Sequence, residues 1–135
     1  MRLRVLVVDD NELWLGYVRT ALKDHPRWSI VAEVSNGFEA IELAAALSPD
    51  LILLDIGLPV LSGITAARQI LANHPPSRIM FVSANGSPAM VEAAMRMGVR
   101  GYLLKSDAHQ LVAAMDAISQ GQSFISERLT RRSDT

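Results

Sequence analysis

The sequence contains no cysteine, and this absence excludes disulfide bonds, thiolate zinc sites and cysteine nucleophiles. It also lacks an excess of one charge. The formal net charge is −1, so no basic field predicts nucleic-acid binding by this stretch itself. No apolar run approaches the ~20 residues that span a bilayer. The first residues lead directly into an apolar run that ends in two acids, unlike a signal peptide. We therefore expect a cytoplasmic protein without membrane contact.

The composition that remains is typical of one globular domain, with 50 % hydrophobic and 20 % charged residues in a chain of 135. Short apolar runs alternate with segments of helical periodicity. We expect strands at 3–8, 28–34, 51–55, 78–82 and 99–105, and helices at 11–24, 38–47 and 64–73, from Ser87 to Gly98, and from a Ser106-Asp107 cap to Gly121. Five such strand–helix pairs predict an α/β fold with a doubly wound parallel sheet.

Acidic residues follow two of these apolar runs. Asp9 and Asp10 come directly after the first run, and Asp55 ends the third. Ligands of parallel sheets bind outside the carboxyl ends of the strands, so the three carboxylates should share one pocket. Such crowding is unfavourable unless a cation or a proton offsets it. Oxygen ligands suit Mg²⁺, and a carboxylate beside Mg²⁺ can act as a nucleophile toward phosphorus.

Two further polar side chains are expected at the same edge of the sheet. Ser83 follows the fourth apolar run, and Lys105 ends the fifth. Each residue alone is more often a polar strand end or a helix cap. An acid cluster, a hydroxyl and a lysine together resemble a phosphoryl-transfer site, with a metal, an acceptor and two groups for the phosphate oxygens. Trp14, which follows the acid pair, is expected to cover the edge between helix and sheet.

Four motifs carry a resemblance to a known family: Val7-Val8-Asp9-Asp10, Leu53-Leu54-Asp55-Ile56-Gly57-Leu58-Pro59, Val82-Ser83-Ala84 and Gly101-Tyr102-Leu103-Leu104-Lys105. In order and spacing the chain resembles the receiver domain of bacterial two-component response regulators over about residues 3 to 121. The resemblance implies a flavodoxin-like (βα)5 sheet with strand order 2-1-3-4-5, which is also a worked example of the doubly wound rule.

The same resemblance implies a role for each site residue. Asp55 would accept a phosphoryl group from a histidine kinase or phosphotransfer protein. Mg²⁺ would be held by Asp10, Asp55 and the Gly57 carbonyl, and by Asp9 partly through water. Lys105 would pair with a phosphate oxygen. The switch would consist of Ser83, with Ala84 beside it, and of Tyr102, whose rotamer would change when Ser83 turns toward the phosphoryl group. This change would alter the face formed by the helix from Ser87 to Gly98, the strand at 99–105 and the last helix, and so control an output.

The departures from the common receiver pattern favour one subfamily. Lys105 is followed by Ser106 rather than proline, which is similar to the NarL-type receivers that precede a LuxR-like helix-turn-helix. The domain would then be residues 1–121, and residues 122–135 would form a linker or tail leading to an output domain. DNA would be contacted only through that output domain, and phosphorylation would modulate a homodimer. The chain would be a phosphoacceptor rather than an enzyme.

Three alternatives remain open at this stage. A stand-alone receiver would act by protein–protein contact. A Mg²⁺-dependent phosphatase that forms an aspartyl phosphate should carry an acid–base Asp two residues after its nucleophile, where this chain has Gly57. A flavodoxin-like binding module would need a phosphate-cradling loop after the first strand. That loop is instead acidic and would repel phosphate without a metal.

Overall fold

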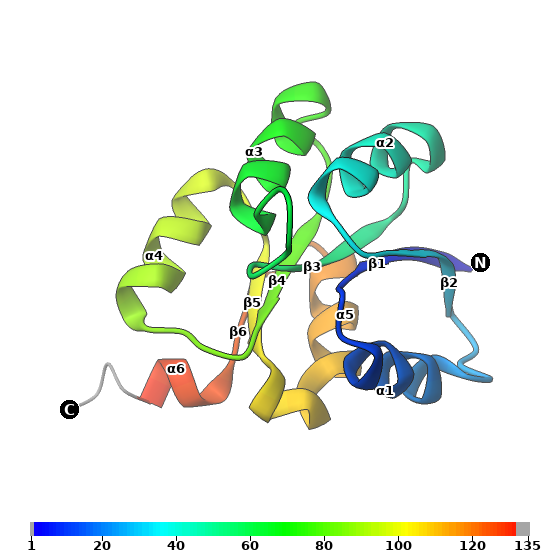
Figure 1. Ribbon diagram of the computed structural model, residues 1–135. Coiled ribbons are helices and arrows are strands. Elements are labelled where there is room, and N and C mark those ends of the chain that lie inside the picture. The colour runs from blue at the N-terminus through cyan, green and yellow to red at the C-terminus, as the bar shows by residue number, and fades with distance from the viewer. Residues whose placement is uncertain (1, 132–135) are drawn as a thin grey trace.

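The computed structural model describes residues 2–131 and forms a parallel sheet with helices on both faces (Figure 1). Its strands are β1 (Leu3–Val8), β2 (Trp28–Val34), β3 (Leu51–Asp55), β4 (Ile79–Ser83), β5 (Gly101–Leu104) and β6 (Phe124–Ile125). They lie in the order β2-β1-β3-β4-β5-β6, with parallel neighbours. The expected doubly wound α/β fold and its 2-1-3-4-5 order are confirmed, and β6 is added at one edge.

The helices divide between the two faces of the sheet. They are α1 (Glu12–Leu22), α2 (Gly37–Leu47), α3 (Gly63–Asn73), α4 (Pro88–Met97), α5 (Leu111–Ser119) and α6 (Glu127–Arg131), with a 3-10 helix η1 (Lys105–Gln110) before α5. Figure 1 shows α1 and α5 on one face and α2, α3 and α4 on the other. In the part of the chain that the structure describes, no helix has the length and apolar character needed to cross a bilayer.

Each face of the sheet has its own hydrophobic core, because successive strand side chains point to opposite faces. Leu6 and Val8 of β1 pack toward α2, α3 and α4, whereas Val5 and Val7 pack toward α1 and α5. All four are essentially inaccessible to solvent. Burial on both faces explains why the central strands are continuous apolar runs and why polar groups are confined to the strand ends.

Side-chain caps begin α1 and α4. The Asn11 side chain accepts hydrogen bonds from the backbone N–H groups of Leu13 (2.9 Å) and Trp14 (3.2 Å) and caps α1. Ser87 caps α4 by accepting from the Met90 N–H, and Gly98 ends that helix at φ 103°, as expected. These caps fix the two helices that follow β1 and β4.

The start of the last helix was predicted incorrectly. Ser106-Asp107 does not cap α5, because η1 intervenes and contains no side-chain cap. Asp107 is instead buried, and its carboxylate accepts hydrogen bonds from the Ser126 hydroxyl, the Arg128 backbone N–H (3.3 Å) and the Arg128 Nε (3.0 Å). A helix cap and a buried anchor use the same residue types, so the sequence did not separate them.

The segment after Gly121 packs on the domain, which differs from the expectation of a linker that leaves it. Phe124 and Ile125 pair with Gly101 and Tyr102 as strand β6, and Leu129 of α6 is buried. The remainder of the expected tail, residues 132–135, lies outside the described residues. Contact with β5 places this segment close to the carboxyl edge of the sheet.

We expect the Asp107→Asn variant to lose about 1–3 kcal/mol of unfolding free energy at pH 7, the usual effect of disturbing a buried hydrogen-bonded carboxylate. Burial alone would raise the pKa of Asp107, but hydrogen bonds from Ser126 and Arg128 outweigh burial and lower it below 3.8. A lowered pKa stabilises the fold above pH 3.8, and this stabilisation disappears as the pH falls through the folded value.

Urea denaturation across this pH range measures the effect. The gap between wild type and Asp107→Asn should narrow in acid. The control is Asp24→Asn, which changes an exposed carboxylate and should stay within about 0.5 kcal/mol of wild type at each pH. A gap that is the same at all pH values would contradict the ionised anchor.

Candidate functional site

The carboxyl ends of β1 and β3 bring three carboxylates together. Val8 pairs with Leu54, so Asp9 and Asp55 emerge side by side, and Asp10 follows at the surface. Ligand oxygens of all three aspartates lie within 4.8 Å of one another. Asp9 is 1 % exposed and Asp55 is 8 % exposed. The three predicted acids therefore do lie together, two of them buried and one exposed.

Lys105 enters this pocket from the end of β5. Its Nζ lies 2.9 Å from Asp9 Oδ2 and 4.0 Å from Asp55 Oδ2. The sequence prediction that Lys105 would join the acids is therefore supported by position. In this structure its nearer partner is Asp9. One ammonium group against three carboxylates leaves the pocket with an excess of negative charge.

The buried Asp9 carboxylate has capacity for a cation. Its Oδ1 accepts the Asn11 backbone N–H at 2.8 Å. Its Oδ2 is buried and makes no hydrogen bond of good geometry within residues 2–131, so that its contact with Lys105 is a charge contact. A buried carboxylate oxygen in this state is unfavourable. Together with the neighbouring oxygens it forms the hard-oxygen donor set that Mg²⁺ prefers, and the residues present fit this ion.

Asp55 is positioned by backbone contacts of the loop that follows β3. The Gly57 N–H donates to Asp55 Oδ1 at 3.1 Å, and this contact orients the carboxylate. Gly63 begins α3 so close to the strand end that a Cβ there would lie 2.1 Å from the Asp55 carbonyl oxygen. Only glycine allows this approach. Metal binding by the Gly57 carbonyl remains a prediction.

Burial raises the pKa of Asp55 above 3.8, and the negative charge of Asp9 raises it further. The Gly57 N–H and the Lys105 ammonium act in the opposite direction, and Asp10 adds a smaller upward effect. The net upward shift means that ionised Asp55 is unfavourable in the folded protein. A proton or a cation that neutralises Asp55 would therefore stabilise the folded protein.

Ser83 lies on β4 and Tyr102 on the neighbouring strand β5, and both side chains form a hydrogen bond with the backbone of Asn85. Ser83 ends β4, with Ala84 exposed beside it, and its Oγ accepts the Asn85 N–H at 3.2 Å. The Tyr102 ring is fully buried, and its hydroxyl donates to the Asn85 carbonyl at 2.8 Å. Gly86 makes room for this ring, since a Cβ there would lie 3.0 Å from Tyr102 Cε1. Tyr102 thus occupies a buried position, and its rotamer change remains a prediction.

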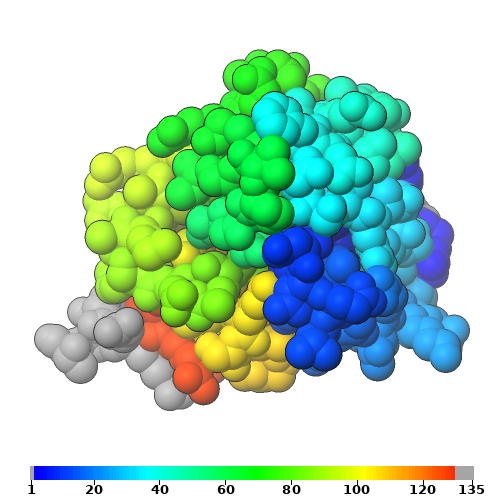
Figure 2. Space-filling model, in the orientation of Figure 1, coloured from blue at the N-terminus to red at the C-terminus, as the bar shows by residue number. Residues whose placement is uncertain are grey.

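The sequence predicted the packing of Trp14 but not its contact with Lys105. Trp14 packs in the core between α1 and the sheet, as expected. In addition, Lys105 Nζ lies 5.6 Å from the centre of its ring. The two residues are distant in the sequence and meet only because β1 and β5 end at the same edge. Figure 2 shows parts of the chain that are distant in sequence, coloured blue, green and yellow, adjoining on one face of the molecule.

The fold and this constellation together define a class of protein. The family model of the response regulator receiver domain matches residues 5–116, and the chain belongs to this family. The receiver prediction from sequence is confirmed.

Individual relatives refine the comparison. The chain is 33 % identical over 127 residues to the nitrate/nitrite response regulator protein NarL of Escherichia coli K12, covering 93 % of this chain and 59 % of NarL. It is 40 % identical over 107 residues to a protein-glutamate methylesterase/protein-glutamine glutaminase of Shewanella frigidimarina, covering 78 % and 27 %. The crystal structure of a LuxR-family two-component response regulator from Aurantimonas sp. SI85-9A1 superposes with a TM-score of 0.91 at 30 % identity, covering 97 % and 94 %. The chain spans little more than half of NarL.

We expect Asp55→Asn to raise the thermal unfolding midpoint by a few degrees at pH 7 in metal-free buffer. The raised pKa of Asp55 means that the folded state binds more protons than the unfolded state between pH 3.8 and the folded value. Stability therefore falls as the pH rises through this window, and the cost persists at neutral pH. The amide avoids that cost.

Calorimetry from pH 3.5 to 8 would measure this difference. The gain should shrink toward the acidic end, as protonation of Asp55 in the unfolded state approaches that in the folded state. The Glu42→Gln variant changes an exposed acid and serves as the control. A destabilised Asp55→Asn at pH 7 would contradict the assignment of an unfavourable buried charge.

Proposed function

We propose that this domain is a phosphorylation-dependent signalling switch that accepts a phosphoryl group on Asp55. The observation that carries the proposal is the meeting of Asp9, Asp10 and Asp55 within 4.8 Å, with the Lys105 ammonium beside them. Mg²⁺ would be held by Asp9, Asp10, Asp55 and the Gly57 carbonyl. When bound, Mg²⁺ would offset carboxylate charge and polarise the phosphoryl oxygens.

Asp55 is the nucleophile in this proposal. A carboxylate oxygen attacks the phosphorus of a phosphohistidine on a kinase or phosphotransfer protein. The P–N bond breaks, its electron pair returns to the imidazole nitrogen, and an aspartyl phosphate forms. The Gly57 N–H holds the Asp55 carboxylate during the attack. Lys105, 4.0 Å from Asp55 in this structure, neutralises a phosphoryl oxygen.

Ser83 would carry the signal out of the pocket. Turning its hydroxyl toward the phosphoryl group replaces its contact with the Asn85 N–H by a stronger charge-assisted hydrogen bond. Asn85 also accepts from the Tyr102 hydroxyl, and the Tyr102 carbonyl accepts the Ser126 N–H at 2.8 Å. This chain of contacts gives a route from Asp55 to the segment after Gly121. To act as a switch, this chain of contacts needs only to shift the equilibrium between two conformations whose free energies differ by a few kcal/mol.

The output that fits best is transcription regulation by a DNA-binding domain beyond residue 135, in a cytoplasmic protein. NarL-type relatives and the LuxR-family structure support this proposal. Residues 1–121 would form the receiver, and residues 122–135 would lead to the output domain. Phosphorylation would change the population of a homodimer. The relatives also include methylesterases, but the chain covers only 27 % of the one from Shewanella frigidimarina. The domain itself is proposed to be a phosphoacceptor rather than an enzyme.

Phosphorylation is tested with a small phosphodonor. Incubation with phosphoramidate and Mg²⁺ should add one phosphoryl group to the intact mass of the wild type. Asp55→Asn should gain none, because the nucleophilic oxygen has been replaced by an amide. Equal incorporation into the two proteins would remove Asp55 from the mechanism.

Metal binding is tested separately by isothermal titration with Mg²⁺. Asp10→Asn should weaken binding on the order of tenfold, because one anionic oxygen donor is lost. Glu12→Gln is the matched control, since Glu12 is also acidic and exposed but pairs with Arg19 on α1. Unchanged affinity in Asp10→Asn would remove Asp10 from the metal site. A large fall in its melting temperature would instead make Asp10 a structural residue.

A further inference from the structure

Two aromatic residues on α1 contact the β5–α5 connection. Trp14 and Tyr17 lie three positions apart and therefore on one face of the helix. Their rings stack with centroids 5.5 Å apart and planes at 18°. Trp14 reaches the Lys105 ammonium at 5.6 Å, and the Tyr17 hydroxyl donates to the Ala108 carbonyl at 2.9 Å. The pair thus contacts both the Lys105 side chain and the backbone three residues beyond it.

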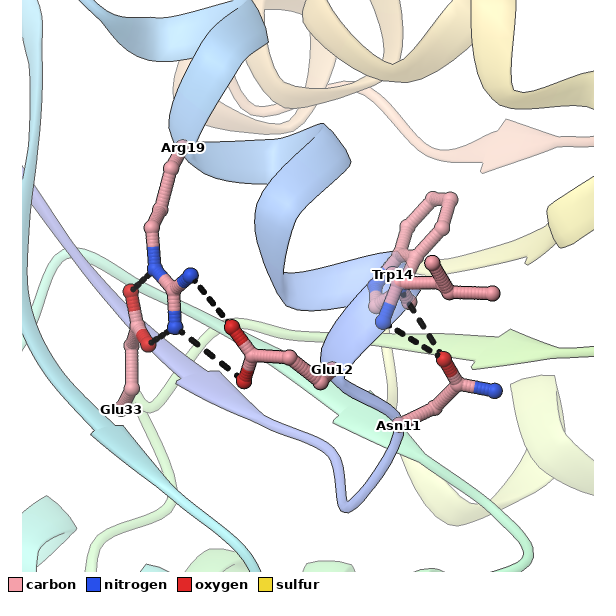
Figure 3. A network of polar contacts seen from close by, with 6 residues as sticks. Asn11, Glu12, Trp14, Arg19 and Glu33 are labelled. Atoms are coloured by element: carbon pink, nitrogen blue, oxygen red, sulfur yellow. Dashed lines mark hydrogen bonds and ion pairs between the residues drawn. The ribbon is translucent and has the colours of Figure 1, made fainter.

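The helix that carries this pair is itself held in place. The Asn11 side chain caps its first turn, and Figure 3 shows the Arg19 guanidinium between the carboxylates of Glu12 and Glu33. The contact between Arg19 and Glu33 joins α1 to β2. Trp14 is only 6 % exposed, so its ring has a packed position. Lys105 thus meets a fixed surface on α1.

Lys105 has three partners within reach, and two of them change during the proposed reaction. Asp9 is the nearest, at 2.9 Å, and Asp55 lies at 4.0 Å. A bound cation would offset the charge of both carboxylates, and a phosphoryl group would change the charge at Asp55. The Trp14 ring keeps its electrostatic character in every state, and an ammonium within about 6 Å of an indole centre is attracted to it. A flexible lysine stem gains the most from such a constant partner.

We propose that Trp14 is a positioning residue for Lys105, an inference that rests on the proposed function of Asp55. The indole keeps the ammonium at the rim of the pocket, from which it can move from Asp9 to a phosphoryl oxygen on Asp55. Tyr17 acts indirectly, because it stacks on the Trp14 ring and donates a hydrogen bond to Ala108 in the β5–α5 connection. Without the indole, Lys105 either stays on Asp9 or turns into solvent.

The kinetic test measures phosphorylation by phosphoramidate at saturating Mg²⁺. Trp14→Leu should react about 3- to 10-fold more slowly than wild type, the effect expected for loss of a partly desolvated cation–π contact. Trp14→Phe keeps an aromatic face and should recover most of the rate. Leu13→Ala is the matched control, because Leu13 is the neighbouring residue on α1 and is 86 % exposed.

A double-mutant cycle distinguishes positioning from packing. If Trp14 acts through Lys105, Trp14→Leu should change the rate by less than about twofold in a Lys105→Met background. An equal loss in both backgrounds would show that Trp14 does not act through Lys105 and would overturn the inference. Equal rates for folded Trp14→Leu and wild type would overturn it as well. A wild type that gains no phosphoryl group would instead defeat the proposed function of Asp55.

Tryptophan fluorescence provides a readout that needs no reaction. Trp28 is fully buried, and its Nε1 donates to Asp116 at 2.9 Å, away from the acid pocket. Lys105→Met should therefore change the emission of metal-free protein through Trp14 alone, and the change should disappear in Trp14→Phe. Identical spectra of wild type and Lys105→Met would overturn the inference. This comparison tests the Lys105–Trp14 contact on which the inference depends, even if Trp14→Leu fails to fold.

Discussion

The arrangement of the pocket depends on one unfavourable interaction, the crowding of carboxylates where β1 and β3 end. The parallel register of the two strands makes Asp9 and Asp55 neighbours, and both are buried. Burial raises the pKa of Asp55, and the negative charge of Asp9 raises it further. Lys105 relieves part of this charge by lying against Asp9. The remaining negative charge is the physical reason why this edge of the sheet suits a divalent cation rather than a neutral ligand.

The surrounding structure can be understood as the means of holding this unfavourable arrangement. Two hydrophobic cores, one on each face of the sheet, fix the strand ends from which the acids emerge. Gly63 lets α3 approach the end of β3, and Gly86 leaves space for the Tyr102 ring. Asp107 shows the opposite electrostatic balance, because its hydrogen bonds to Ser126 and Arg128 lower its pKa despite burial. One buried acid is thus stabilised in its ionised form, while the ionised form of another, Asp55, is unfavourable.

Much of the fold was predictable because parallel strands buried on both faces leave continuous apolar runs. The same logic places Asp9, Asp10, Asp55, Ser83 and Lys105 at one edge, where the structure has them. Three features were not predictable. β6 has only two residues, Phe124 and Ile125, too few to show a period. Asp107 has the sequence context of a helix cap, and its partners lie about twenty residues away. Trp14 meets Lys105 only through tertiary packing, so local sequence predicts burial but not the cation contact.

The most direct test of the charge-balance account is a high-resolution crystal structure with Mg²⁺ and beryllofluoride, which stands in for the phosphoryl group on Asp55. The account predicts a metal bound by Asp9, Asp10 and Asp55, with Lys105 Nζ moved from Asp9 Oδ2 to a fluoride. It is contradicted if beryllofluoride occupies Asp55 while the metal binds elsewhere and Lys105 remains on Asp9.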